Sequence, residues 1–158
     1  MAAPTLDVRG FSHVCINVSD VERSLAFYRD VLGLRVIFDV QLGGEGMEAA
    51  TGEAGARGRM VGCLVPGSRV TLELLGFAHR AEAPSQAARA PVGYSNVALA
   101  VPDLAAARAA LVARGARPGL PVEVGGVRML FVRDPDGTAI ELIEFPGGAL
   151  SSAEHNGA

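Results

Sequence analysis

The stretch that decides the fold is a ten-residue phrase near the start of the chain, Phe11-Ser12-His13-Val14-Cys15-Ile16-Asn17-Val18-Ser19-Asp20. A second phrase of the same pattern follows later, Tyr94-Ser95-Asn96-Val97-Ala98-Leu99-Ala100-Val101-Pro102-Asp103. The end of each copy repeats too, since Val70-Thr71-Leu72-Glu73-Leu74-Leu75-Gly76-Phe77 aligns with Thr138-Ala139-Ile140-Glu141-Leu142-Ile143-Glu144-Phe145. Two separate segments that agree in order and residue type indicate a duplicated module.

Each copy predicts four strands and one helix. The first strands are expected at 10–18 and 94–101, from their β-branched alternation. The first helix starts at a capping box of Ser19 and Glu22 and ends at Gly33, and the second spans 104–114. The remaining strands are expected at 34–40, 60–65, 70–77, 120–124, 127–133 and 138–145. We therefore predict an α+β fold of two βαβββ modules, which form a cupped mixed sheet with the helices outside.

The domain organisation follows from the repeat. We expect a first module at 8–78, with a Gly-rich insertion at 41–58, and a second module at 92–146. An Ala/Pro-rich connector at 79–91 joins them, and 147–158 is expected to be a flexible tail. The insertion is interpreted either as a lid over the site or as a passive loop.

Composition excludes several classes of protein. The chain has 158 residues, of which 49% are hydrophobic and 20% charged, the balance of a globular protein. A net charge of −3 gives no basic field for nucleic acid, and no apolar run reaches membrane length. All 14 basic residues are arginines, which excludes a lysine Schiff base. Two cysteines without metal-type spacing and a start without an export signal favour a cytoplasmic protein, and the Ala/Gly/Arg bias suggests a bacterial one.

Strand alternation places polar residues on one face of the predicted sheet. Side chains at i and i+2 share a face, so His13 lies opposite the aliphatic set around Ile16. The same logic brings four polar residues to equivalent inward positions, namely His13, Glu73, Asn96 and Glu141. They form either a structural polar cluster or a metal site. Two buried carboxylates repel each other and a dication removes that repulsion, so the metal site is favoured.

Three further residues are candidates for lining a pocket: Phe11, Cys15 and Tyr94. Cys15 is expected beside His13, as a small hydrophobic side chain rather than a nucleophile. Core packing explains the two aromatic residues equally well.

Four phrases resemble the vicinal oxygen chelate superfamily, which includes glyoxalase I, methylmalonyl-CoA epimerase, extradiol dioxygenases and the fosfomycin and bleomycin resistance proteins. They lie at 11–14, 24–34, 70–74 and 134–142, the last containing Asp134-Pro135-Asp136-Gly137, and the resemblance covers about 8–146. It implies paired βαβββ modules around a divalent metal, and a homodimer whose modules pair within one chain or between two.

The resemblance also implies a ligand set of His13, Glu73 and Glu141, with Asn96 where the family usually has a second His. That replacement argues against a ring-cleaving iron site, whereas Glu73 agrees with glyoxalase I and the epimerase. One imidazole with up to three oxygens suits Mn²⁺, Fe²⁺, Co²⁺, Ni²⁺, Mg²⁺ or Zn²⁺.

The expected function is that of a metal-dependent lyase or isomerase. It would move a proton next to the chelated carbonyl of a small metabolite, with Glu141 or Glu73 as the base. One alternative is a metal-free protein that sequesters a drug or natural product, like the bleomycin resistance members. The other is an atypical non-haem iron oxygenase.

Overall fold

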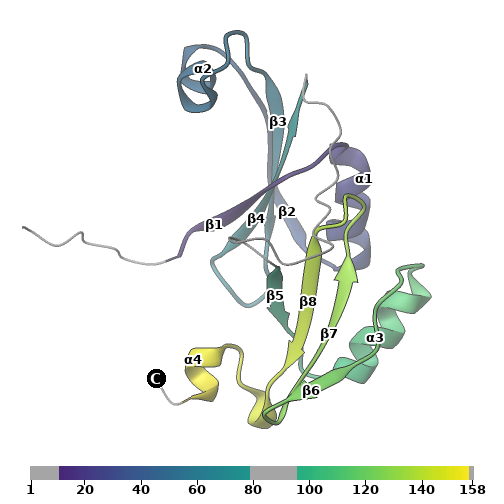
Figure 1. The fold of residues 1–158 in the computed structure, drawn as a ribbon. Helices are drawn as coiled ribbons and strands as arrows, with labels where there is room; N and C mark the ends of the chain where they lie inside the picture. Colours follow the sequence, from purple (N-terminus) through teal and green to yellow (C-terminus); the bar gives the residue numbers. More distant parts are fainter. Residues whose placement is uncertain (1–10, 79–95, 157–158) are drawn as a thin grey trace, which may run out of the picture. The chain divides into compact units, whose positions relative to one another are not determined.

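A computed structural model describes residues 11–78 and 96–156 of the chain (Figure 1). The predicted connector at 79–91 and the pocket candidate Tyr94 lie outside the described residues. The described residues divide into two compact units. The first contains 11–21 and 34–78, and the second contains 22–33 together with 96–156.

The first unit is a four-stranded mixed sheet. Its strands are β1 (His13–Asn17), β2 (Arg35–Leu42), β3 (Gly58–Leu64) and β4 (Thr71–Phe77), arranged in the order β1-β4-β3-β2. The pair β1/β4 is parallel, and the other pairs are antiparallel. The insertion at 41–58 extends β2 and β3 and carries the short helix α2 (Glu45–Thr51) at their tip, as Figure 1 shows.

The second unit repeats this topology. Its strands are β5 (Val97–Ala100), β6 (Val122–Val124), β7 (Val127–Arg133) and β8 (Ala139–Glu144), arranged in the order β5-β8-β7-β6. Again the first and last strands of the unit are parallel and the rest antiparallel. The matching order confirms the prediction of an α+β fold with two βαβββ modules.

Helix α3 (Leu104–Ala113) packs against β7 and β8 of its own sheet. It starts where predicted, because the Asp103 carboxylate accepts a hydrogen bond from the Ala106 N–H at 2.9 Å. Leu104 and Leu111 on its inner face are buried. The sheet contributes Leu130 and Ile140, both fully buried, to the same core.

The first helix belongs to the second unit, although it precedes the second copy in sequence. Helix α1 (Val21–Leu25) continues into a π-helical stretch, Ala26–Val31, in which the Leu32 N–H donates to the Phe27 carbonyl at 2.9 Å. Gly33 ends it with a φ of 77°, a conformation that glycine adopts without strain. The second compact unit therefore includes this helix together with 96–156.

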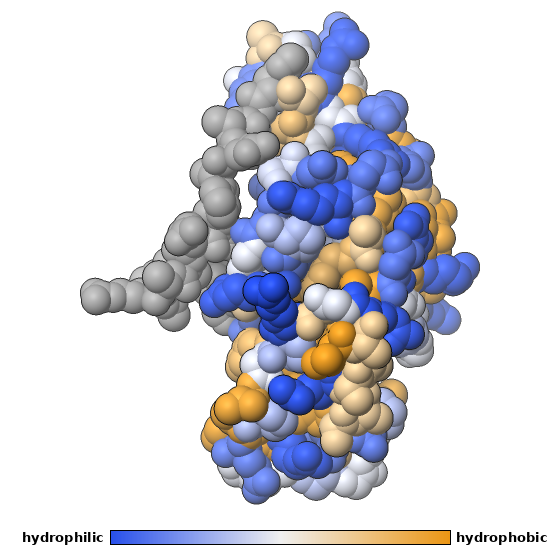
Figure 2. All heavy atoms as spheres, turned by 90° about the vertical axis from the view of Figure 1, so that its right-hand side faces the viewer, coloured by the Kyte–Doolittle hydropathy of each residue, from blue (hydrophilic) through white to orange (hydrophobic). Residues whose placement is uncertain are grey.

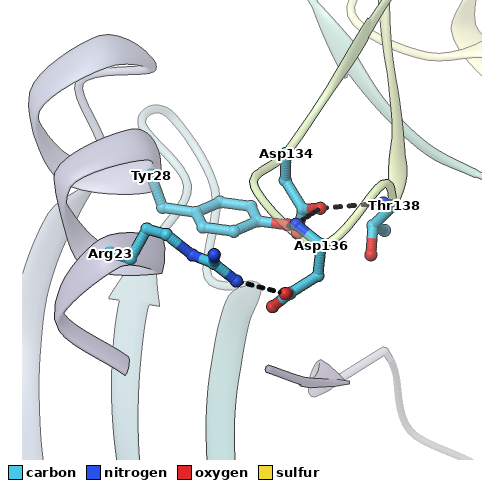
Figure 3. A network of polar contacts seen from close by, with 5 residues as sticks. All are labelled: Arg23, Tyr28, Asp134, Asp136 and Thr138. Carbon is cyan, nitrogen blue, oxygen red and sulfur yellow. Dashed lines mark hydrogen bonds and ion pairs between the residues drawn. The ribbon is translucent and has the colours of Figure 1, made fainter. Parts of the chain in front are cut away.

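A buried hydrogen bond joins this helix to the turn between β7 and β8 (Figure 3). The Tyr28 hydroxyl, on a side chain with no exposed surface, donates to Asp134 Oδ2 at 2.8 Å. Asp134 Oδ1 accepts from the N–H groups of Asp136 at 3.0 Å and Thr138 at 2.8 Å, which fixes the Asp-Pro-Asp-Gly turn. Arg23 pairs with Asp136 at 2.6 Å across the same contact.

The segment predicted to be a flexible tail contains two short helical pieces, Pro146–Gly148 and α4 (Ser152–His155). No helix in the part of the chain that the structure describes is long and apolar enough to cross a membrane. On the face seen in Figure 2, hydrophobic side chains are interspersed among hydrophilic ones, as on ordinary globular surfaces.

Tyr28→Phe tests whether the buried hydrogen bond holds the helix to the turn. The variant keeps the ring, which packs edge-on against Phe27 at 5.2 Å, but leaves Asp134 Oδ2 without its described donor. We expect the free energy of unfolding in urea to fall by about 1–3 kcal/mol.

Ser24→Ala is the matched control on the same helix. Its hydroxyl is also completely buried, yet it has no hydrogen-bond partner among the described residues. Removing it should raise the free energy of unfolding by about 1 kcal/mol, because an unsatisfied buried hydroxyl is destabilising. An equal decrease in the free energy of unfolding for both variants would contradict this expectation. It would mean that the loss of side-chain volume, and not the loss of the Tyr28 hydrogen bond, destabilises the protein.

Candidate functional site

His13 and Glu73 lie on adjacent strands of the first unit. Parallel pairing of β1 with β4 sets His13 opposite Thr71 and Cys15 opposite Glu73, so all four side chains share one face. The other face carries Leu72 and Leu74, which are buried. The alternation predicted from the sequence therefore describes this sheet correctly.

The polar contacts of this pair leave metal-ligating atoms available. His13 Nδ1 lies 3.7 Å from Glu73 Oε1 and 3.1 Å from the Ser12 hydroxyl. The Thr71 hydroxyl donates to the same Glu73 oxygen at 3.3 Å. The His13 side chain is 47% exposed and that of Glu73 13% exposed. Within 11–78 and 96–156, His13 Nε2 and Glu73 Oε2 make no hydrogen bond.

Asn96 and Glu141 form the corresponding pair in the second unit. Ala98 is opposite Glu141 in the parallel pair β5/β8, and Asn96 precedes Ala98 by two residues, as His13 precedes Cys15. The Asn96 amide Nδ2 donates to Glu141 Oε2 at 2.8 Å. The two copies therefore hold an acid and its neighbour in the same register, as the repeat predicts.

No arginine in the described part of the chain forms an ion pair with either acid. Among the described residues, the arginines pair instead with Asp30, Asp39, Asp136 and Glu144. Among the described residues, the partner of Glu73 with a possible positive charge is His13, whose Nδ1 lies 3.7 Å from Glu73 Oε1. Partly buried carboxylates without a fixed cation are what a divalent-metal site requires.

Cys15 is an exposed residue whose thiol is partly shielded from solvent. Burial and, to a lesser extent, the Glu73 carboxylate opposite raise the pKa of this thiol above its ordinary value. A raised pKa keeps the thiol protonated near neutral pH, and a thiol is a much weaker nucleophile than a thiolate.

The three residues that the sequence suggested for a pocket differ in where the structure places them. Cys15 shares the face of Glu73, as described above. Phe11 lies just before β1 and is 68% exposed. Tyr94 falls outside the residues that the structure describes. The assignment of these three residues to a pocket stays a prediction.

Two phenylalanines beside the acids were missed by sequence reasoning. In the second unit, Phe131 on β7 is directly opposite Glu141 and is 42% exposed. In the first unit, Gly62 on β3 takes that place opposite Glu73, and the Phe38 ring from β2 lies over it. A Cβ atom at Gly62 would lie 2.5 Å from Phe38 Cζ, so the ring fills the space of a side chain at that position.

A β-bulge explains why Phe38 was hard to find. The register between β2 and β3 shifts between Val36 and Phe38, so that Val36 is opposite Cys63 while Phe38 is opposite Gly62. Simple alternation would put Val36 and Phe38 on the same face. Phe131 had a readable signal, since it is an aromatic residue on the exposed side of a strand whose other side is buried.

The donor atoms suit a divalent cation. Imidazole nitrogens and carboxylate oxygens are both ligands that first-row divalent ions accept. The structure shows no single cluster of three or more His, Cys, Asp or Glu residues within the described ranges. His13 and Glu73 belong to the first unit, and Asn96 and Glu141 belong to the second.

The comparisons with known proteins agree with this topology. The model of the Glyoxalase/Bleomycin resistance protein/Dioxygenase superfamily matches residues 10–142. The lactoylglutathione lyase of Haemophilus influenzae is 30% identical over 144 residues, covering 84% of this chain and 90% of that protein. The chain belongs to the glyoxalase/bleomycin resistance/dioxygenase superfamily, as its sequence motifs predicted.

Solved structures show the same fold. A glyoxalase family protein from Bacillus cereus has a TM-score of 0.77 at 22% identity, with 90% of this chain and 98% of that chain covered. An antibiotic-binding protein from Streptomyces sp. has a TM-score of 0.64 at 21% identity, with 89% and 98% covered.

Gly62→Ala tests whether the Phe38 ring is seated on the glycine. The new methyl group would overlap the ring, so we expect the free energy of unfolding to fall by about 1–3 kcal/mol and the Phe38 ring protons to shift in NMR spectra.

Gly46→Ala is the control, because nothing lies within 4 Å of a Cβ atom there and the residue is in helix α2. It should be neutral or stabilising by up to about 1 kcal/mol. An unchanged stability and spectrum for Gly62→Ala would show that the ring does not occupy this position.

Proposed function

We propose that the protein is a metal-dependent lyase or isomerase of the glyoxalase type, which transfers a proton next to a carbonyl of a small metabolite. The observation that carries the proposal is the pair of carboxylates, Glu73 and Glu141, held in the same register in both copies without an arginine partner. The likeness to a lactoylglutathione lyase at 30% identity supports the same reaction class.

The proposed ligands are His13, Glu73 and Glu141. Each is a side chain on the less buried face of its sheet and has at least one ligating atom without a hydrogen bond inside the described ranges. A divalent ion bound by them would polarise a substrate carbonyl and acidify the neighbouring C–H group. Mn²⁺, Fe²⁺, Co²⁺, Ni²⁺, Zn²⁺ and Mg²⁺ are compatible with this donor set.

Either carboxylate can serve as the base. Glu73 Oε1 receives the Thr71 hydroxyl and Glu141 Oε2 receives the Asn96 amide, so each acid is oriented by a neighbour through one oxygen. The second oxygen of each is then available to accept the proton or to bind the ion.

Asn96 has a positioning role in this proposal. Its Nδ2 group donates to Glu141 at 2.8 Å, so the amide holds the carboxylate in place. The carbonyl oxygen of an amide is also a ligand for hard cations. A second His in its place would add an imidazole to the ligand set.

Asn96 also favours a second candidate function, the sequestration of a natural product without a metal. Replacement of the usual second His by Asn96 removes one ligand of the family pattern, and a metal-free protein that sequesters a natural product does not need it. The fold is shared with an antibiotic-binding protein from Streptomyces sp..

Location and assembly complete the proposal. We propose a cytoplasmic protein, because two cysteines without metal-type spacing do not make a disulfide framework. We also propose a homodimer.

Mixing two variants tests whether one metal ion takes its ligands from two chains. A dimer of one His13→Ala chain and one Glu141→Gln chain would restore metal binding only in that case.

Metal binding is the direct test. Wild-type protein purified without added metal should contain a divalent ion, or bind Mn²⁺, Ni²⁺ or Zn²⁺ in calorimetry. His13→Ala, Glu73→Gln and Glu141→Gln should each weaken binding by about 100-fold or more, because loss of an outer-shell partner alone costs 10–100-fold. Exchange of the C–H proton of hydroxyacetone in D₂O, followed by NMR, should disappear with the metal.

Glu123→Gln is the matched control. Glu123 is an exposed carboxylate on β6, in the same sheet as Glu141. Together with Arg128, the residue opposite it on β7, it lies on the face of the sheet that Glu141 does not share. This variant should bind metal like the wild type. A wild-type protein that binds no metal, but retains a natural-product ligand after His13→Ala and Glu141→Gln, would establish the sequestering function instead.

A further inference from the structure

The less buried face of the first sheet carries an arginine as well as the site residues. Arg35 begins the edge strand β2 and is opposite Leu64 on β3. Leu64 is opposite Thr71 on β4, and Thr71 is opposite His13 on β1. Directly opposite residues on paired strands point to the same side of a sheet. Arg35 therefore shares a face with His13, and with Glu73, which follows Thr71 by two residues.

The β-bulge in β2 brings this arginine and an aromatic ring to the same face. Arg35 and Phe38 are three residues apart, so strict alternation would put them on opposite faces. The register shift between Val36 and Phe38 changes that, because it sets Phe38 opposite Gly62, and the Phe38 ring covers this glycine. Bulges are frequent next to binding sites, where they redirect a side chain.

The charge of Arg35 is available to a ligand. Among the residues that the structure describes on this face, Arg35 is the one with a permanent positive charge. It is exposed and forms no ion pair within the described ranges. Asp39, the acid on the same strand, pairs with Arg59 at 2.6 Å. An exposed guanidinium without a carboxylate partner is suited to bind a ligand carboxylate through two parallel hydrogen bonds.

The register limits the length of such a ligand. Arg35 and Glu73 are two strands and two residues apart. With strands about 4.8 Å apart and a rise of about 3.3 Å per residue, their backbones are separated by about 12 Å. Leu64 and the Phe38 ring lie between them on this face. An extended arginine covers part of that distance, which leaves a span the size of a benzene ring between the guanidinium and the acid.

We propose that the substrate carries a carboxylate at the end remote from its reacting carbonyl, that Arg35 binds this carboxylate, and that an apolar spacer contacts Leu64 and Phe38. The inference rests on the proposed function, because it takes Glu73 as the place of the carbonyl. All of these residues belong to the first unit.

A tripeptide thiol such as glutathione matches this face less well. It carries two carboxylates and an ammonium group, whereas the face has one guanidinium and an apolar stretch beside it. A dication on Glu73 would also attract carboxylates, so the experiment has to separate the effect of Arg35 from that of the metal.

The test uses ligand-observed NMR with three probes, with and without added Zn²⁺: 4-(hydroxyacetyl)benzoate, its neutral amide 4-(hydroxyacetyl)benzamide, and glutathione. The wild type should bind the benzoate about fivefold or more tightly than the benzamide in both conditions, because charge-assisted hydrogen bonds are stronger than neutral ones. The preference should shrink as NaCl is added, since salt screens exposed charges. Glutathione should bind more weakly than the benzoate.

Variants of two residues assign the preference to its cause. Arg35→Gln should abolish the preference for the benzoate and leave the affinity for the benzamide unchanged. Arg35→Lys should retain part of the preference, because an ammonium group keeps the charge but not the planar pair of donors. Phe38→Leu should weaken binding of both aryl probes by about threefold without changing the preference between them.

Arg57→Gln is the matched control, with the same change of charge at an exposed residue of the same unit. Arg57 directly precedes β3 and is seven residues from Leu64, about 23 Å along an extended strand. This variant should keep the full preference for the benzoate. Circular dichroism and urea unfolding show whether each variant is folded.

Four outcomes would overturn the inference. They are equal affinity for the benzoate and the benzamide, a preference that survives Arg35→Gln, an equal loss in Arg57→Gln, and tighter binding of glutathione than of the benzoate. Zn²⁺ binding is measured on the same samples. A preference that depends on Arg35 in a protein that binds no metal refutes the metal-dependent function alone, whereas metal binding without that preference refutes the inference alone.

Discussion

The parallel pairing of the first and last strands of each unit is the constraint on which the site depends. It sets Cys15 opposite Glu73 and Ala98 opposite Glu141, and so brings each acid next to its polar neighbour. A slip of one residue in either pair would turn the acid into the core, where Leu72 or Ile140 is now buried. The buried aliphatic rows therefore fix the register, and the register places the acids.

Much of this arrangement could be predicted from the sequence, because two-residue alternation and a repeat are local patterns. The strands were expected within a few residues of their observed bounds, and the acids on the less buried faces. Two features were not predictable. Periodicity shows which side of the helix at 22–33 is apolar, but not which sheet that side covers. Similarly, the bulge between Val36 and Phe38 inserts a residue without any change in the hydrophobic pattern.

The two copies share the register that packing imposes, but they differ in the residue beside the glutamate. Both keep a glutamate at the same register, but one has an imidazole beside it and the other a carboxamide. An imidazole can bind a metal or take up a proton at physiological pH, whereas a carboxamide only donates and accepts hydrogen bonds. The two units thus hold their acids in the same register beside neighbours of different chemical capacity.

The position of the first helix has a consequence for biosynthesis. Tyr28 and its acceptor Asp134 are 106 residues apart in the chain, and the helix joins a sheet whose strands are all translated after it. During synthesis on the ribosome, the apolar surfaces of Leu25, Phe27 and Tyr28 therefore stay exposed until most of the chain has emerged. Contacts of such long sequence separation slow folding. The nascent first half therefore exposes apolar surface, which favours aggregation, until the second half has emerged.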